Sequence, residues 1–248
     1  MGGFILAGFI TGLAIGLTGV GGGSILAPLL LLLGVAPGQV VGNDLVFASI
    51  TKGVALYPYK KEGKIHILTA KKLLLGSIPG GVIGIFLLEH LKKTSASSAL
   101  LTHVLAGVII AASIISLLKE LLNFKGSFLS LPQEDWRVIV IGFIAGVIVG
   151  LTSIGAGILV GLYLYATGRF DSRELVGTDI FHGLILALVL GFMHFKLGNI
   201  NPKILIYLIL GSLPGALIGG RLNFYLSPKT VRIIFLSLTT ALSLKILI

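Results

Sequence analysis

The chain has 248 residues, of which 55% are hydrophobic and 11% charged, and its mean hydropathy is +1.06. A soluble globule of this length cannot cover so much apolar surface, so the composition excludes a soluble protein and predicts a chain that lies in a bilayer. The formal net charge is +10, but the basic residues are scattered over short loops, which argues against nucleic acid as a partner.

Apolar runs predict five helical segments in each half, so the expected fold is an all-α polytopic membrane protein. In the first half the runs cover residues 4–18, 24–33, 44–57, 70–88 and 99–118. In the second half they cover residues 138–151, 154–167, 179–194, 204–220 and 230–248. A helix needs about 20 residues to cross the hydrocarbon core, so the first two segments of each half are too short. We expect each such pair to form a bent or re-entrant hairpin.

A glycine-rich pattern begins each half. Residues 8–26 read GFITGLAIGLTGVGGGSIL, and nine of these nineteen positions are identical in residues 142–160. A second block, GSIPGGVIG at residues 76–84, returns as GSLPGALIG at residues 211–219. Duplicated apolar segments interrupted by glycine are typical of membrane transporters that build a site between two repeats.

The duplication predicts a first transmembrane repeat at residues 1–118, a linker at 119–136 and a second repeat at 137–248. If each hairpin returns to the side on which it starts, thirteen lysines and arginines fall on one side of the membrane and five on the other. The positive-inside rule then makes the first side cytoplasmic and places the N-terminus outside. Five passes in each half make the repeats inverted, whereas counting each hairpin as one span makes them parallel. The larger charge asymmetry favours inversion.

Glycines recur at every fourth position of the second block and form a smooth ridge along one helix face. Small residues let membrane helices approach closely, so we predict a packing role, and we expect Pro79 and Pro214 to bend the two helices. The ridge glycines are Gly76, Gly80, Gly84, Gly211, Gly215 and Gly219.

Substrate contact is predicted at the two glycine-rich bends. Glycines there expose backbone N–H groups just before a helix N-terminus, and both features favour an anion. A tight turn with close helix packing would need the same glycines, but the repetition of the bend in both halves favours binding. The predicted substrate-binding residues at the bends are Thr18, Gly21, Gly22, Gly23, Ser24, Thr152, Ser153, Gly155 and Gly157.

Ionisable residues inside the apolar segments are expected to be functional, because each costs at least about 2.5 kcal/mol in a bilayer. Lys52 is the predicted substrate-binding countercharge, and snorkelling towards the cytoplasmic Lys60 is the alternative. The candidates for proton coupling or an ion pair are Asp44, Asp179, His182 and His194.

Each of these candidates also has a structural interpretation. Asp44 and Asp179 could lie in first helical turns that are capped by Asn43 and Thr178. Asp179 could orient His182 one turn later, or this histidine could bond a backbone carbonyl in the core. His194 ends its segment, which favours an interfacial role.

Several motifs occur in order through both halves and together resemble the TauE/SafE family of sulfite and organosulfur-anion exporters. They are GLTGVGGGSILAPLL, VGNDLVFASITK, GSIPGG, VGTDIFHGLILALVLGFMHFKLGNI and GSLPGALIGGRL. The resemblance implies an inner-membrane secondary transporter for a small sulfur-containing anion. It also implies threonine at the position of Asn43, as at Thr178, and leaves open whether the two halves are equivalent there.

We therefore predict a proton-coupled exporter of sulfite or an organosulfonate, with the anion held at the midplane between the two bends. Its expected partners are this anion and the lipid bilayer, a homodimer is left open, and no catalytic residue, metal or cofactor is expected. A cation or metal transporter could instead use Asp44, Asp179, His182 and His194 as ligands, but the chain has few acidic residues. An intramembrane enzyme would need Ser24 or Ser153 beside a histidine, and no spacing indicates such a pair.

Overall fold

The computed structural model describes most of the chain. The residues left out of the description are 19–22, 95–101, 104–105, 109, 112–113, 115–116, 119–134, 155, 223–224, 227 and 248. The predicted linker, apart from its last two residues, and much of the fifth apolar segment of the first half therefore lie outside the described residues.

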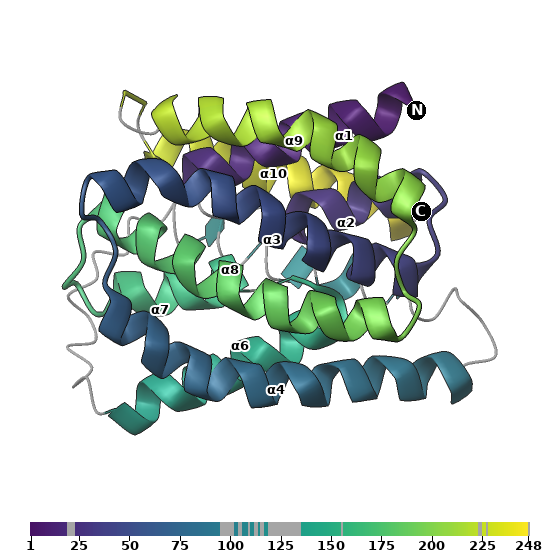
Figure 1. Cartoon of the computed structure of the whole chain (residues 1–248), viewed down its shortest axis with the longest axis horizontal. Helices are drawn as coiled ribbons and strands as arrows, with labels where there is room; N and C mark the ends of the chain where they lie inside the picture. Colours follow the sequence, from purple (N-terminus) through teal and green to yellow (C-terminus); the bar gives the residue numbers. More distant parts are fainter. Residues whose placement is uncertain are drawn as a thin grey trace.

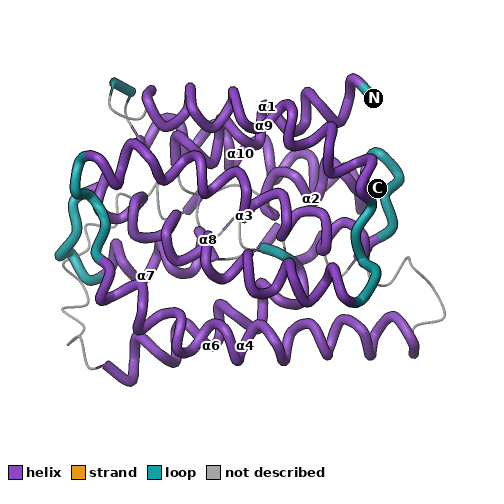
Figure 2. The backbone as a smooth tube through the Cα atoms, viewed as in Figure 1, coloured by secondary structure: helices purple, strands orange, loops and turns teal. Residues whose placement is uncertain are grey.

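The described residues form helices and no strand, which confirms the predicted all-α fold (Figure 2). The helices of the first half are α1 (Gly2–Thr18), α2 (Gly23–Leu32), α3 (Pro37–Lys61) and α4 (Ile67–Thr94). Those of the second half are α6 (Asp135–Thr152), the π-helical turn η2 (Ala156–Val160), α7 (Gly161–Ala166), α8 (Ser172–Lys196), α9 (Pro202–Leu222) and α10 (Pro228–Leu247).

Three stretches among the described residues are long and apolar enough to cross a membrane. They are Ile67–Lys93, Ser172–Lys196 and Pro202–Leu222. Shorter apolar helices include α1 and α2, as the lengths of the runs predict. The third helix of each half is longer than its apolar run, because its first turns carry polar residues such as Gln39 and Glu174.

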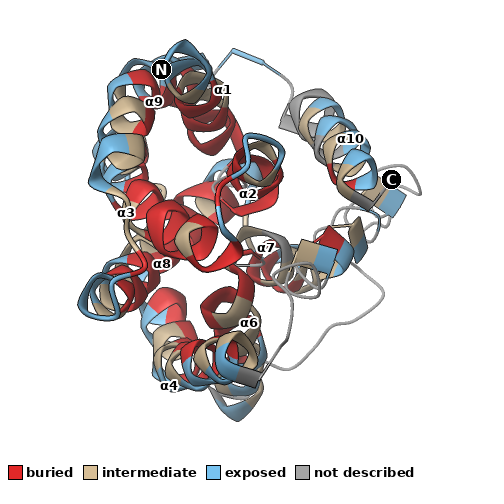
Figure 3. Cartoon of the chain, turned by 90° about the vertical axis from the view of Figure 1, so that its right-hand side faces the viewer, coloured by how far each residue is buried: buried red, intermediate tan, exposed pale blue. Residues whose placement is uncertain are grey.

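The main helix contacts join one helix from each half. α1 packs along α9, α4 packs along α6, and α3 packs against α8 between these two pairs (Figure 3). α10 lies to one side, against α2. The central pair α3 and α8 therefore lies at the contact between the halves.

Glycine ridges explain the close approach in the two outer pairs. A methyl group at Gly76, Gly80 or Gly84 would overlap the backbone of α6, and one at Gly211 or Gly215 would overlap the backbone of α1. The same holds at Gly219, so the predicted packing role is confirmed for all six ridge glycines. Contacts between successive positions run in the same order on both helices, so α4 runs parallel to α6 and α9 runs parallel to α1.

The central helices run in opposite directions. Gly177, near the start of α8, meets Tyr59 near the end of α3 and Lys64 in the connection that follows α3. Gly191, near the end of α8, meets Leu45 and Val46 in the first half of α3. Figure 1 shows the connections 62–66 and 167–171 together at one end of the long axis. The connections 33–36 and 197–201 lie at the other end, beside the N-terminus.

Candidate substrate site

The described parts of the two glycine-rich bends touch each other in the core. α2 begins at Gly23, and a methyl group there would overlap the carbonyl group of Ser153, which directly follows α6. Ser24 is buried, and Gly157 lies in the π-helical turn that continues the second bend. Gly21, Gly22 and Gly155 lie outside the described residues.

The second bend has an unusual backbone. Ser153 has a φ angle of 60°, in the left-handed region that residues other than glycine seldom occupy. The position at the 134-residue offset in the first half is Gly19, a residue type that adopts this conformation freely. The serine at this position, where the first half has glycine, is the difference in sequence that distinguishes the second bend from the first.

Both predicted threonines use their hydroxyl groups in local backbone hydrogen bonds. Thr18 Oγ1 donates to the carbonyl of Ala14 at 2.8 Å, and Thr152 Oγ1 donates to that of Ile148 at 2.7 Å. Thr152 Oγ1 also accepts the N–H of Ile154 at 3.1 Å, so this side chain holds the second bend in shape.

Asp44 lies inside α3 and is completely buried. Neither of its carboxylate oxygens has a hydrogen-bond partner among the described residues. The polar groups that act on it are Ser153, at the second bend, and Lys52, two turns further along α3. Asp44 is therefore influenced both by the second bend and by Lys52.

Lys52 points across the central pair into α8. The residue is 5% exposed, and a methyl group on Gly183 would overlap its Nζ atom. The snorkelling interpretation is therefore wrong, because Gly183 leaves a space on α8 that accepts the ammonium group. Within the described part of the chain, Lys52 forms no ion pair, although it acts electrostatically on Asp44 and His182.

His182 is held by a residue that sequence reasoning missed. Its Nε2 lies 2.9 Å from Ser77 Oγ on α4, and its Nδ1 has no hydrogen-bond partner among the described residues. Among the described residues the ring therefore makes neither the hydrogen bond to Asp179 nor the one to a backbone carbonyl that the sequence suggested. Asp179 itself is buried in α8, at the position that Asp44 occupies in α3.

Ser77 directly follows Gly76 of the ridge, and this position beside a predicted helix contact is the feature of the sequence that could have indicated Ser77. The repeat-equivalent Ser212 follows Gly211 and accepts a hydrogen bond from Thr51 Oγ1 at 2.9 Å. Each ridge thus places one hydroxyl group against the third helix of the opposite half.

Asn43 and Thr178 do not cap helices, because α3 and α8 begin at Pro37 and Ser172. Asn43 Oδ1 instead accepts the N–H of Asn201 at 3.1 Å, and Thr178 Oγ1 accepts that of His66 at 2.9 Å. The two positions therefore make equivalent contacts although the residue types differ. Asn43 joins α3 to the connection before α9, and Thr178 joins α8 to the connection before α4.

His194 is buried apart from the residues around Lys52, in a partly exposed polar cluster near the end of α8. Its Nδ1 is 3.1 Å from Asn199 Nδ2, which also donates to Glu89 Oε1 at 2.7 Å. Lys92 Nζ donates to Asn199 Oδ1 at 2.7 Å and to Glu89 Oε1 at 2.8 Å. This outer cluster, made of Glu89, Lys92, His194 and Asn199, joins α4 of the first half to the second half.

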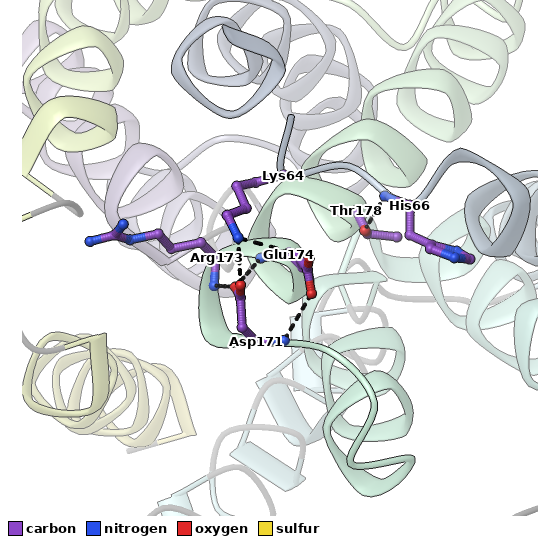
Figure 4. A network of polar contacts seen from close by, with 6 residues as sticks. All are labelled: Lys64, His66, Asp171, Arg173, Glu174 and Thr178. Atoms are coloured by element: carbon purple, nitrogen blue, oxygen red, sulfur yellow. Dashed lines mark hydrogen bonds and ion pairs between the residues drawn. The ribbon is translucent and has the colours of Figure 1, made fainter. Parts of the chain in front are cut away.

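A second ionic network lies at the opposite end of the central pair (Figure 4). Lys64 Nζ is 2.7 Å from Asp171 Oδ2 and 3.8 Å from Glu174 Oε1. Asp171 also caps α8 by accepting the N–H groups of Arg173 and Glu174. Burial opposes the ionisation of Asp171, but Lys64 and these N–H groups outweigh it and hold the pKa of its carboxyl group below the ordinary value.

Comparison with known proteins identifies the family. Residues 4–246 match the family described as sulfite exporter TauE/SafE. The chain belongs to the TauE/SafE family. Two curated relatives from Bacillus subtilis (strain 168) are similar over nearly their whole length. The probable membrane transporter protein YjnA is 34% identical over 250 residues, which cover 98% of each chain. The probable membrane transporter protein YdhB is 28% identical over 246 residues, which cover 96% of each chain.

No solved structure is significantly similar to the chain. Membership of the TauE/SafE family, together with the three long apolar stretches, makes the chain a multi-pass membrane transporter.

Proposed function

We propose that the chain is a secondary transporter that exports sulfite or a related small sulfur-containing anion such as an organosulfonate. Lys52 carries the proposal, since it is a buried cation that points across the central pair with no ion pair among the described residues. A buried charge needs a partner of opposite sign, and the name of the family supplies a small anion.

Contacts between the described residues support a site that extends from the bends to α8. Gly23 meets Ser153, Ser153 and Lys52 are polar groups that act on Asp44, and Lys52 Nζ meets Gly183 on α8. In this proposal the anion binds Lys52 and the N-terminal backbone of α2 at Gly23 and Ser24, where the helix dipole favours negative charge. Gly21, Gly22, Gly155 and Gly157 complete the predicted bends around it.

Asp44 is the proposed proton-coupling residue nearest to this anion. An ionised carboxylate there competes with the substrate for Lys52, so binding of a proton to Asp44 and binding of the anion favour each other. Asp179 and His182 are proposed in the same role from α8, and His194 is proposed to act in an ion pair at the outer cluster.

We also propose that the chain lies in the inner membrane as two inverted repeats, with the N-terminus outside. The antiparallel course of α3 and α8 supports inversion. The connections 62–66 and 167–171 lie at the end opposite the N-terminus. They and the end of α3 contain Lys61, Lys64 and Arg169, which supports a cytoplasmic position for that end. A membrane potential that is negative inside favours export when the anion and the proton that crosses with it together carry net negative charge, by about 2.3 kcal/mol per net charge per 100 mV.

Transport of labelled sulfite into proteoliposomes tests the proposal. Lys52→Gln should reduce the initial rate at least about tenfold, since a desolvated charge pair contributes more than about 1.4 kcal/mol. Lys203→Gln removes the same charge from an exposed site and is the matched control. Unlabelled sulfate, thiosulfate and sulfonates, added as competitors, would rank the substrates. If Lys52→Gln leaves the initial rate of sulfite transport as unchanged as Lys203→Gln does, the proposed role of Lys52 is contradicted.

A cation transporter is the second candidate, and the buried Asp44 carboxylate favours it. The same proteoliposomes distinguish the two classes. Uptake of labelled sodium without sulfite, abolished by Asp44→Asn and retained by Lys52→Gln, would favour the cation transporter.

A further inference from the structure

A pocket of about 690 Å³ opens where α3 and α9 end and α8 begins. Its basic lining residues are Lys61 from α3, Arg173 from α8 and Arg221 from α9, and the acidic one is Glu62. Figure 4 shows that the side chain of Arg173 points away from Asp171 and Glu174. Neither Lys61 nor Arg221 forms an ion pair with any described residue. The described lining residues therefore carry an excess of two positive charges, which suits an anionic ligand.

Two exposed tyrosines are among the residues that line this pocket. Tyr57 is 67% exposed and Tyr225 is 85% exposed, and both line the pocket. Exposed tyrosines in a membrane protein are typical of the headgroup level, because the ring prefers the lipid boundary and the hydroxyl group prefers water. The pocket therefore lies at the depth where lipid phosphates are found.

Exposed apolar side chains continue from the pocket towards the middle of the membrane. On α9, Leu217 lines the pocket, and Leu210, two turns earlier, is 58% exposed on the same face. On α3, Ile50 lies two turns before Tyr57 and is also exposed. A ligand that follows these faces has an anionic head and apolar chains, which distinguishes it from a small free anion.

We propose that this pocket binds the phosphate headgroup of an anionic phospholipid, with its acyl chains along α3 and α9. Arg173 and Arg221 are suited to phosphate because guanidinium groups donate paired hydrogen bonds to it, and basic pockets between membrane helices are typical sites for such headgroups. The bound lipid joins the ends of α3, α8 and α9, which belong to both halves of the chain. The proposal does not depend on the identity of the transported substrate.

Native mass spectrometry of the purified full chain with phosphatidylglycerol or phosphatidylcholine tests the proposal. We expect preferential binding of phosphatidylglycerol, weakened about fivefold by Arg221→Gln and further by the double variant Arg173→Gln/Arg221→Gln, since each cation near a lipid surface contributes about 1 kcal/mol. Lys203→Gln, which removes the same charge near the other end of the bundle, should leave the preference unchanged. Arg221→Lys should retain part of it.

Thermal unfolding supplies an independent measurement on folded protein. Phosphatidylglycerol should raise the Tm of the parent chain more than phosphatidylcholine does, and the double variant should lose this difference. Equal effects of the two lipids, or a difference that survives the double substitution, would overturn the proposal. Inorganic phosphate or sulfite that reproduces the whole increase would also overturn it, because the pocket would then be a site for a free anion.

Discussion

Lys52, Asp44 and His182 are ionisable residues buried around the contact between α3 and α8. Such groups reduce stability unless they are fully paired, and no ion pair joins them among the described residues. Each also touches or acts on a residue from the other half of the chain. These side chains therefore respond to any movement of one half against the other, which favours a role in transport over a role in stability.

At the level of a single residue, Asp44→Asn tests proton coupling. Asparagine keeps the shape of the side chain and cannot ionise, so sulfite transport in proteoliposomes should continue while its dependence on a pH gradient is lost. Asp179→Asn is the matched variant in α8, and comparing the two shows which half carries the proton. Full retention of the gradient dependence in both variants would contradict coupling through these carboxylates.

At the scale of the helix, close packing depends on the glycine ridges of α4 and α9. The Cβ of an alanine at Gly80 would overlap the backbone of Phe143 on α6, and a backbone cannot move aside as a flexible side chain can. The distance between the two helices therefore depends on the missing side chain.

Gly80→Ala should destabilise the chain by about 1–3 kcal/mol, the usual cost of overpacking. Gly53→Ala is the control, because its added methyl group would lie 3.9 Å from Leu184 Cδ1, an ordinary contact. That substitution should be neutral or stabilising by up to about 1 kcal/mol, since alanine favours a helix over glycine. Thermal unfolding in detergent measures both, and equal Tm values for the two variants would rule out the packing explanation.

Asp171→Ala tests the start of α8 and should cost about 0.5–2 kcal/mol through loss of the N-cap. The lowered pKa of Asp171 makes its contribution complete above the unfolded value of about 3.9, and this contribution is lost as the pH falls towards the folded value. A paired aspartate loses its contribution to stability between about pH 5 and pH 1. Over this range the free energy of unfolding of the variant should therefore fall less than that of the parent chain. Ser172→Ala, at the next and exposed position, should match the parent in thermal unfolding at each pH.

At the scale of the whole molecule, polar networks tie the two halves together at both ends of the central pair. Lys64 meets Asp171 and Glu174 at one end, and the outer cluster around Asn199 lies at the other. If one half rocks against the other during transport, each network must open when the site faces its side of the membrane.

Labelling of a single introduced cysteine measures this opening cleanly, because the chain has no cysteine of its own. In a Ser24→Cys background, Lys64→Ala should speed labelling by a thiol reagent added on the Lys64 side. Asn199→Ala should speed labelling from the opposite side. Equal acceleration from both sides in either variant would show that these networks do not control access.

Much of the molecule could be predicted from local or periodic features of the sequence. Apolar runs predicted the helices, and ridge glycines four residues apart predicted their close packing, because both depend on the composition and spacing of one segment. Helix starts were harder to predict, since the first turns of α3 and α8 mix polar residues and glycine with apolar residues. Asn43 and Thr178 were therefore misplaced at caps, although they lie inside helices.

Side-chain partners around the candidate site required the folded chain. The contact of Lys52 with Gly183 and the hydrogen bond of His182 with Ser77 join residues more than a hundred positions apart. Hydrophobicity and spacing indicate which face of a helix is buried, but they do not indicate which distant side chain it meets. That choice depends on how the helices of the two halves pack, because only their relative positions bring a cation, a carboxylate and a glycine-rich bend together.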